Sequence, residues 1–568
     1  MDYIVLADTY EKLEAMSSKL SKADILASFL KKTSAENLEK AVLLVQGTVF
    51  PYFSGYELGI ATQMMIKAIS KASGFKESEI EEKFKKTGDL GLVAEDVVKS
   101  KKQSTLLKKK LTIDFIFNNL QQLAYITGSG SQGKKLKLIA ELLVSAKPKE
   151  ARYIVRTVLG ELRVGAAEGI IRDAIVKAFL IKENMTKEQK NELTDAVDYA
   201  YHIVSDFGEV AKIAKERGLI GLRKSRVELG KPIQVMLGEK AESIKEVVDD
   251  FGKVAAEYKY DGMRAQIHKK GNEVWVFTRR LEDVSKQFPD LVELCKKCLK
   301  PKECIVDGEV LGINTKTNEP LPFQQLSQRI QRKYDIEKIA KEIPIQMNLF
   351  DILFVNGEML FEKEFLERRK ILEKNVSILP RKFQLAKQIL TDNVTIIDKF
   401  YKEALNAKQE GVFLKVPSSK YTFGRHVDGW YKIKPIMETL DLIIIGATWG
   451  EGTRTKWLSS YVVAVKNPNT DEFLECGMMS TGLTEAEYQT MTETLQPLIL
   501  KSKGRSVEIR PKIVVEVGYQ EIQKSPNYKS GFALRFPRLI RIRYDKGIED
   551  VDTIERLETL FKSQGKSG

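Results

Sequence analysis

The sequence predicts a multidomain chain of three parts: an all-α region over residues 1–225, an α+β region over residues 226–437 and an all-β region over residues 438–568. Three observations predict this division. Apolar residues recur at three- and four-residue spacing in the first part. Strand-like and helix-like runs alternate in the second part, and short β-type runs separated by turns fill the third. A chain of 568 residues is long enough to build several separate cores.

Composition limits the kind of protein. A hydrophobic content of 43% and a charged content of 30% are typical of globular chains. No apolar run reaches membrane-spanning length, and the first residues do not resemble a signal peptide. A net charge of +14 indicates a polyanionic partner, either nucleic acid or an anionic membrane surface. The 4 cysteines indicate a reducing compartment, and Cys295 and Cys298 fit one face of a helix over residues 289–299 better than a zinc site.

The first part is expected to be helical over five stretches, which are residues 10–29, 35–46, 56–72, 115–126 and 139–146. The boundary to the second part is expected where glycine and proline interrupt this periodicity, at Gly218, Gly221, Gly230 and Pro232.

Basic clusters punctuate the helical part, at Lys99, Lys101 and Lys102, at residues 108–110, and at Lys134 and Lys135. Each cluster alone is typical of a solvated helix end, but their repetition favours nucleic-acid binding. Residues 128–135, GSGSQGKK, almost match a nucleotide-binding P-loop, yet Lys135 stands where Ser or Thr must hold magnesium. A loop at a helix start can still bind a DNA phosphate.

The chain is organised around residues 257–264, EYKYDGMR. Strands are predicted over residues 253–258, 265–268 and 274–277, with a hairpin-type turn at Asp261 and Gly262. Lys259 is then expected at the end of a strand beside the turn, where it is a candidate amine nucleophile. A surface lysine beside a hairpin turn is the alternative.

Charged and aromatic residues recur in later apolar strands of the second part. Residues 305–311 carry Asp307 and Glu309, and a carboxylate in such a strand needs a partner, a ribose hydroxyl or a metal ion. Residues 347–353 carry Phe350, which belongs either to the core or against a purine. Glu410 precedes the next strand, GVFLK. Lys432 and Lys434 share one face of a strand, where two ammonium groups suit a phosphate-rich ligand.

Six motifs occur in order: KxDGxR at 259–264, FTRR at 277–280, DGE at 307–309, FD at 350–351 within an apolar strand, EGVxxK at 410–415 and WxKxK at 430–434. This succession resembles the motif series of covalent nucleotidyltransferases, and nearly the whole chain is similar to the archaeal and eukaryotic type of ATP-dependent DNA ligase. Residues 160–169, rich in glycine and small residues, resemble the helical DNA-binding domain of that family. Phe413 and Leu414 differ from many relatives, which was expected to affect packing and not chemistry.

The resemblance implies a role for each motif residue. Lys259 is the adenylated nucleophile, Glu257 recognises adenine and Phe350 stacks on it. Glu309 serves the ribose or a metal, and Glu410 is the second metal-binding carboxylate. The implied phosphate and nucleotide contacts are Arg264, Arg279, Lys432, Lys434 and Arg425, the last being the basic residue expected shortly before WxKxK.

Short strands at residues 441–447, 461–466, 513–517 and 539–544 predict a small barrel of OB-fold type at the end of the chain. Residues 532–538, FALRFPR, resemble the last motif of the family. That resemblance implies that Arg535 and Arg538 orient the pyrophosphate leaving group. The three parts would then be a DNA-binding domain at 1–225, an adenylation domain at 226–437 and an OB-fold domain at 438–568.

The resemblance also implies ATP and Mg²⁺, or another divalent cation, as cofactors. Nicked duplex DNA is the implied substrate, sealed in replication, repair and recombination by a monomer that is cytoplasmic or nucleoid-associated, with a sliding clamp as a further partner. An RNA ligase or capping enzyme is the alternative, but neither usually carries a large helical domain. A non-catalytic DNA-binding protein is a second alternative, and it gives no reason for Lys259, Glu309, Glu410 and Lys432 to occur in this order.

Overall fold

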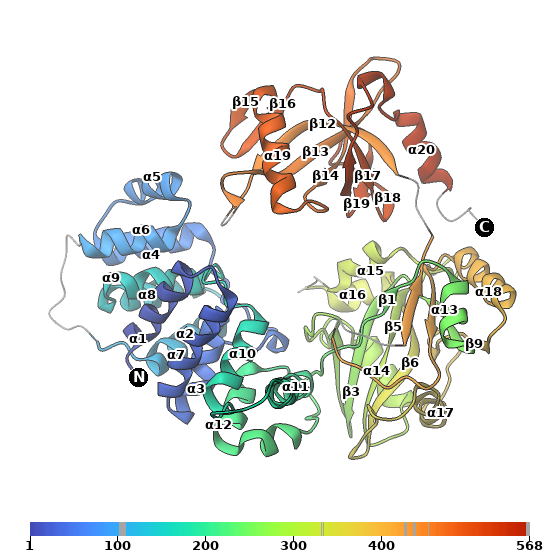
Figure 1. Cartoon of the computed structure of the whole chain (residues 1–568), viewed down its shortest axis with the longest axis horizontal. Coiled ribbons are helices and arrows are strands. Elements are labelled where there is room, and N and C mark those ends of the chain that lie inside the picture. The colour runs from blue at the N-terminus through green and yellow to red at the C-terminus, as the bar shows by residue number, and fades with distance from the viewer. Residues whose placement is uncertain are drawn as a thin grey trace.

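The computed structural model places the chain in three lobes that follow one another along the sequence (Figure 1). It describes residues 1–100, 109–330, 332, 334–424, 429–435, 439–451 and 454–563. Arg425 and the basic residues Lys101, Lys102 and Lys108 lie outside the described residues. Within the described part, no helix is both long and apolar enough to cross a membrane.

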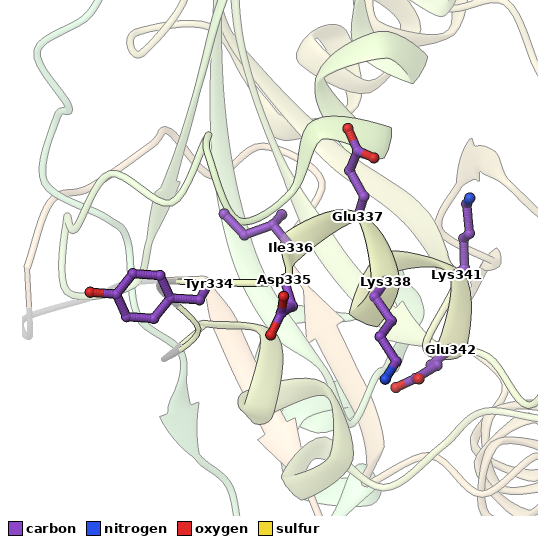
Figure 2. Close-up of a pocket in the computed structure, with 7 residues that line it drawn as sticks. All are labelled: Tyr334, Asp335, Ile336, Glu337, Lys338, Lys341 and Glu342. Atoms are coloured by element: carbon purple, nitrogen blue, oxygen red, sulfur yellow. The ribbon is translucent and has the colours of Figure 1, made fainter.

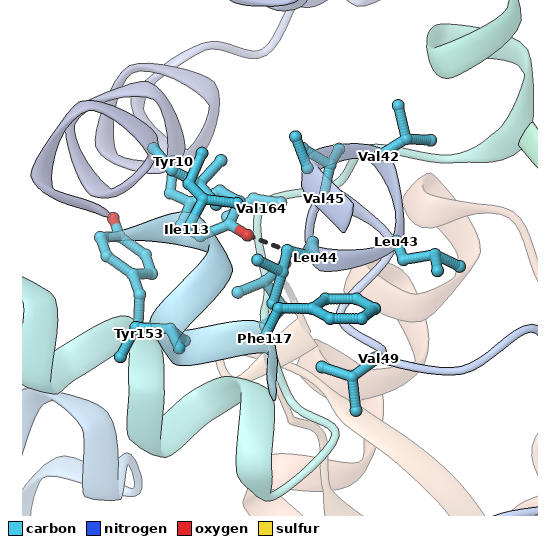
Figure 3. Packing of buried hydrophobic residues seen from close by; sticks show 14 of the residues in the cluster. Tyr10, Val42, Leu43, Leu44, Val45, Val49, Ile113, Phe117, Tyr153 and Val164 are labelled. Carbon is cyan, nitrogen blue, oxygen red and sulfur yellow. Dashed lines mark hydrogen bonds between the residues drawn. The ribbon is translucent and has the colours of Figure 1, made fainter. Parts of the chain in front are cut away.

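The first lobe is built from helices, as predicted. They are α1 (Tyr3–Ala15), α2 (Lys19–Lys32), α3 (Ala35–Val45), η1 (Tyr52–Ser54), α4 (Thr62–Ser73), α5 (Glu77–Thr87), α6 (Leu90–Lys99), α7 (Ile113–Tyr125), α8 (Ser131–Ser145), α9 (Pro148–Val158), α10 (Glu168–Phe179), α11 (Lys187–Val204) and α12 (Phe207–Arg223). One apolar core joins these helices. Figure 3 shows part of it, where the buried Tyr10 hydroxyl donates to the Leu44 carbonyl at 2.7 Å and its ring lies 5.0 Å from that of Tyr153.

Three predicted helices of this lobe were wrong in extent, one of them over residues 139–146, where α8 already begins at Ser131. Residues 10–29 form parts of two helices, because the chain turns at residues 16–18 and the Ser18 side chain caps α2 by accepting from the Ser21 amide. The helix predicted from residue 56 begins at Thr62, since Gly55 and Gly59 take positive φ angles of 67° and 63°. The predictions over 35–46 and 115–126 are confirmed.

The second lobe holds two sheets. The five-stranded sheet has the order β1 (Glu239–Lys240), β11 (Trp430–Ile433), β10 (Gly411–Lys415), β2 (Val254–Lys259) and β9 (Gln388–Thr391). The six-stranded sheet runs β4 (Glu273–Thr278), β3 (Met263–Lys270), β5 (Glu303–Gly312), β6 (Ile345–Val355) and β7 (Glu358–Met359), with β8 (Phe383–Leu385) parallel to β6. The helices are α13 (Ile244–Phe251), α14 (Pro289–Cys298), α15 (Phe323–Ile330), α16 (Ile336–Glu342), α17 (Phe365–Asn375) and α18 (Val394–Asn406). Cys295 and Cys298 lie buried on α14, so the helix expected there is confirmed.

The turn after Lys259 is not a hairpin, which corrects the sequence expectation. β2 belongs to the five-stranded sheet and β3 to the six-stranded sheet, so residues 260–262 carry the chain from one sheet to the other. Gly262 is required at this crossing, because a Cβ atom there would collide with the carbonyl oxygen of Val310 on β5. The sequence motif KxDG therefore marks the junction between the two sheets.

The third lobe is rich in strands. Its elements are β12 (Leu440–Trp449), β13 (Leu458–Lys466), β14 (Phe473–Met479), α19 (Glu485–Leu495), η3 (Gln496–Leu498), β15 (Ile499–Lys503), β16 (Ser506–Ile509), β17 (Val514–Gly518), β18 (Glu521–Lys524), β19 (Phe532–Arg535), β20 (Arg538–Ile542), η4 (Ile548–Asp550) and α20 (Ile554–Ser563). One sheet has the order β14-β13-β12-β16-β15, and β17 pairs with both β12 and β20. The separate pair β18-β19 ends at Arg535, beside the turn to Arg538.

Candidate active site

One face of the five-stranded sheet collects most of the motif residues. In the register between β2 and β10, Lys259 lies opposite Gly411 and Glu257 lies opposite Phe413. On the other side of β10, Phe413 lies opposite Lys432. Residues two apart on a strand and directly opposite across a pair share a face. The side chains of Glu257, Lys259, Phe413 and Lys432 therefore project from the same side of the sheet.

Lys259 is held at the open end of this face. Its Nζ atom lies 2.6 Å from Oε2 of Glu410, and its ammonium group lies 5.5 Å from the centre of the Phe413 ring. Lys434 pairs with the same oxygen of Glu410. The Phe413 ring thus lies beside the proposed nucleophile, and the expectation that the identity of this position affects packing and not chemistry stays a prediction. Gly411 allows the close approach of β11, because a Cβ there would collide with the Ile433 carbonyl oxygen.

The charges around Glu410 alter the acidity of the group. Burial alone would raise the pKa of Glu410, but the ammonium groups of Lys259 and Lys434 outweigh burial and lower that pKa. Burial lowers the pKa of Lys432, and the nearby charges of Lys434 and Arg279 lower it further. The structure therefore brings Arg279 of the FTRR motif to the same cluster. Lys432 itself donates to the Gly238 carbonyl at 2.9 Å.

Arg264 and the DGE motif lie on the neighbouring sheet. Arg264 is paired opposite Glu309 in the register of β3 and β5. Its guanidinium donates to both carboxylate oxygens of Asp307, with Nε 3.1 Å from Oδ1, and to the Met236 carbonyl at 2.5 Å. Arg264 is therefore engaged by protein partners in this structure. The predicted contact of Arg264 with a nucleotide stays a prediction and requires that some of these bonds exchange.

Glu309 and Glu410 form a pair of carboxylates from the two sheets. Burial raises the pKa of Glu309 to about 8, with the charge of Glu410 adding to the shift and that of Lys259 opposing it. A negative charge close to a second buried carboxylate favours a cation beside them. Mg²⁺ typically binds one or two protein carboxylates and completes its shell with water and substrate phosphates. The pair fits this mode, and no group of three or more His, Cys, Asp or Glu ligands occurs among the described residues.

A second carboxylate–lysine pair lies further along the same face. Glu257 is 2% exposed, and its Oε2 atom lies 2.6 Å from Nζ of Lys415. Gln388 donates to Oε1 of Glu257 at 2.8 Å, and Arg369 lies 3.5 Å from that oxygen. The Lys415 ammonium is surrounded by aromatic rings, with centres 4.5 Å away in Phe350, 4.7 Å in Phe365 and 3.9 Å in Trp430.

Sequence reasoning identified Glu257 and Phe350 but assigned no role to Lys415 or Arg369. The available signal was a lysine two residues beyond Phe413 on an apolar strand, where a charge needs a buried partner. Arg369 offered a weaker signal, because it lies on the charged helix α17, far from any motif.

The C-terminal lobe reaches this region through Arg535. Its guanidinium lies 5.8 Å from the centre of the Phe323 ring on α15, and it pairs with Glu521 at 3.2 Å. Burial and Glu410 raise the pKa of Asp261, and the charge of Arg535 opposes that increase. Arg535 is therefore close to the KxDG turn. Arg538 begins β20 and is exposed.

Two hollows of the described surface lie beside this cluster or away from it. One, of about 700 Å³, lies along α16, and its lining is drawn in Figure 2. Another, of about 310 Å³, lies behind β2 against Tyr258, Tyr260 and Gln409. The second is adjacent to the KxDG turn, because Gln409 accepts from the Asp261 amide at 3.2 Å. The motif residues line a sheet face, and the cluster of charged side chains on that face marks the site.

Comparison with known proteins decides what this constellation is. Residues 235–434 match the family model of the "ATP dependent DNA ligase domain", residues 2–176 that of the "DNA ligase N terminus" and residues 454–546 that of the "ATP dependent DNA ligase C terminal region". The chain belongs to the ATP-dependent DNA ligase family. The family resemblance inferred from the six ordered motifs is confirmed.

Relatives agree over the full length of the ligase. The chain is 46% identical to the DNA ligase of Nanoarchaeum equitans, with 99% of each chain covered, and 43% identical to that of Archaeoglobus fulgidus, again with 99% of each covered. A solved structure described as "Pmar-Lig_PreS3" covers 95% of the ligase and 99% of its own chain, at 16% identity and a TM-score of 0.55, and it supports the fold alone. The ligase is thus an ATP-dependent enzyme that requires a divalent metal, and the RNA-ligase, capping and non-catalytic alternatives are not favoured.

Proposed function

We propose that the ligase seals nicks in duplex DNA through a lysyl-AMP intermediate on Lys259. The observation that carries this proposal is the position of the Lys259 amine, 2.6 Å from Glu410 and on the same sheet face as Lys432. The proposed domains are a DNA-binding domain at residues 1–225, an adenylation domain at 226–437 and an OB-fold domain at 438–568. The helical, two-sheet and strand-rich lobes support this division.

In the first step the neutral Lys259 amine attacks the α-phosphorus of ATP. A nitrogen–phosphorus bond forms, the bond from that phosphorus to the bridging oxygen breaks, and pyrophosphate leaves with the electron pair. Glu410 is the nearest acceptor for the amine proton. Lys432 and Lys434 place positive charge beside the phosphorus, where negative charge develops. Glu309 and Glu410 would hold a divalent metal, which when bound would add to the neutralisation of the triphosphate.

The base and sugar are assigned to the residues around the buried end of the face. Phe350 stacks on adenine and Glu257 accepts from its amino group. Glu309 binds either the ribose hydroxyls or the metal ion. Arg264, Arg279 and Arg425 contact the nucleotide and, later, the nick phosphate.

Two transfers complete the reaction. The 5′-phosphate at the nick attacks the lysyl-AMP phosphorus and displaces Lys259, giving 5′-adenylated DNA. The 3′-hydroxyl then attacks the 5′-phosphate, and AMP leaves. The net charge of +14 and the basic helical lobe support phosphate contacts along the duplex. We assign the enzyme as an intracellular monomer, with a sliding clamp as a candidate partner and replication, repair and recombination as its settings.

Intact mass spectrometry tests the proposal directly. Incubation with ATP and Mg²⁺ is expected to add one AMP to the chain. Chelation of the metal should prevent the addition, and pyrophosphate should reverse it. Nicked DNA added without further ATP should discharge the AMP and yield sealed product. A chain that seals nicks without passing through an adduct would contradict the mechanism.

A further inference from the structure

The buried pair of Glu257 and Lys415 has features that stability alone does not require. Both side chains are 2% exposed, and their charged atoms lie 2.6 Å apart. Ion pairs in such positions usually gain little net stability, because desolvation of the two charges offsets their attraction. A buried ion pair that adds little net stability points to a role other than holding the fold.

Lys415 contacts both residues proposed to recognise the base. It pairs with Glu257, and its ammonium lies 4.5 Å from the centre of the Phe350 ring. Rings of Phe365 and Trp430 cover the remaining sides at 4.7 and 3.9 Å. Cation–π attraction to these rings holds the ammonium in place when other hydrogen-bond acceptors are scarce. The position of Lys415 therefore fixes the positions of Glu257 and Phe350 together.

The partners of Glu257 are all donors. Lys415 occupies Oε2, while Gln388 and Arg369 approach Oε1 at 2.8 and 3.5 Å. An ionised carboxylate has about four acceptor positions and no proton to donate. Three positions are occupied, so about one remains for a ligand. The contacts with Lys415, Gln388 and Arg369 therefore hold the carboxylate in one orientation.

We propose that Lys415, supported by Arg369, is a positioning residue that makes Glu257 an acceptor-only reader of the purine 6-position. An amino group at that position, as in adenine, can donate to the carboxylate. An oxo group, as in hypoxanthine, would place two acceptors against each other and leave both without a partner. Lys415 thereby determines the choice of ATP over 6-oxopurine triphosphates, although it does not contact the reacting phosphate. This inference rests on the proposed adenylation of Lys259.

The test compares ATP with inosine triphosphate, since the two differ at the 6-position. Self-adenylation rates are measured on the full chain over a range of each nucleotide, with the nucleotide-labelled protein as readout. The variants are Lys415→Met, which keeps length but removes charge, and Glu257→Gln, whose amide can donate to a 6-oxo group. The matched control is Lys420→Met, which removes an exposed lysine paired with Glu362 at 2.8 Å.

Lys415→Met is expected to lower the ratio of kcat/KM for ATP to that for inosine triphosphate by about ten- to a hundredfold, the range expected for a mispaired buried polar group. The change should lie in KM, with the maximal rate for ATP altered less than about threefold. Glu257→Gln should shift the ratio in the same direction, and Lys420→Met should leave it unchanged. A residue that only stabilises the fold would not change the ratio.

The inference is overturned if the folded Lys415→Met protein keeps the wild-type ratio. If that variant does not fold, an unchanged ratio in Glu257→Gln overturns it equally. Failure of the proposed function has a different outcome, because then the unmodified ligase forms no covalent adduct with either nucleotide.

Discussion

Two lysine–glutamate pairs join β2 to β10 or to Glu410, the residue just before β10, and their differences separate reaction from recognition. Lys259 and Glu410 meet at 2.6 Å with side chains 17% and 25% exposed. Glu257 and Lys415 meet at the same distance with 2% exposure each. The first pair shares its carboxylate with Lys434, whereas the second is enclosed by rings. The two pairs thus have the same separation but different surroundings. The exposed pair can exchange partners and release its amine, whereas the buried pair holds its charges in place.

The largest expected effect comes from breaking the exposed pair at its lysine. Lys259→Ala should lower self-adenylation by about 10⁴-fold or more, because no other amine is placed to attack. Duplex binding should change little, since it depends on many distributed phosphate contacts. Labelled AMP on the variant, measured after gel separation, would show that Lys259 is not the nucleophile.

A smaller effect is expected from the C-terminal arginines Arg535 and Arg538. Charge on the leaving pyrophosphate develops in the first step alone, and Arg535 lies near the KxDG turn. Changing Arg535 and Arg538 to alanine should slow self-adenylation by about a hundredfold. Sealing of a nick that already carries 5′-AMP, assayed without ATP in a single turnover, should slow far less. Equal loss in both assays would assign these arginines to DNA binding or to the stability of the third lobe.

The free energy of unfolding should depend more on the buried pair than on the exposed pair, the reverse of the order expected for self-adenylation. Lys415→Met leaves the buried Glu257 with one partner fewer, and loss of a buried ionic partner costs about 3–5 kcal/mol. Lys434→Met removes a partly exposed charge and should cost at most about 1 kcal/mol. Thermal unfolding followed by tryptophan fluorescence measures the difference. In a double-mutant cycle, Glu257→Gln with Lys415→Met should be less destabilised than the sum of the single variants, and simple additivity would contradict a direct pairing.

The smallest effect on self-adenylation is expected from the region most distant from both pairs in sequence. A chain lacking residues 1–225 should form lysyl-AMP within about threefold of the full chain, because the proposed ATP contacts all follow that region. Nick sealing should fall severely, and DNA binding should show a shallower salt dependence as fewer phosphates are neutralised. If the truncated chain seals nicks at the normal rate, the helical lobe is not needed for sealing and has another function.

The exposed pair was largely predictable from the sequence, and the buried pair was not. Lys259, Glu410 and Lys434 occur in ordered motifs whose residue types match phosphate chemistry, so pattern alone grouped them. This grouping holds although the connection between β2 and β3 was predicted wrongly. The turn after Lys259 joins two sheets and is not the predicted hairpin. Periodicity identifies strands, but it does not determine which sheet each strand enters.

Lys415 and Arg369 acquire their roles only from tertiary packing. The approach of Arg369 to Glu257 depends on how α17 packs on the sheets, and no local pattern encodes that contact. The difference between Phe413 and the apolar residues of many relatives predicts an effect on packing, and the strand register adds that its ring lies beside Lys259. The helix expected over residues 10–29 failed for a local reason, because a serine cap at Ser18 ended the apolar periodicity in favour of a new helix.

Site mapping of the adenylated chain tests the central claim most directly. The ligase is incubated with ATP and Mg²⁺, digested at a pH that preserves the phosphoramidate, and sequenced by tandem mass spectrometry. The account predicts AMP on Lys259 alone, with Lys415, Lys432 and Lys434 unmodified. AMP on any of those three lysines, with Lys259 unmodified, would contradict the division between a reactive exposed pair and a fixed buried pair.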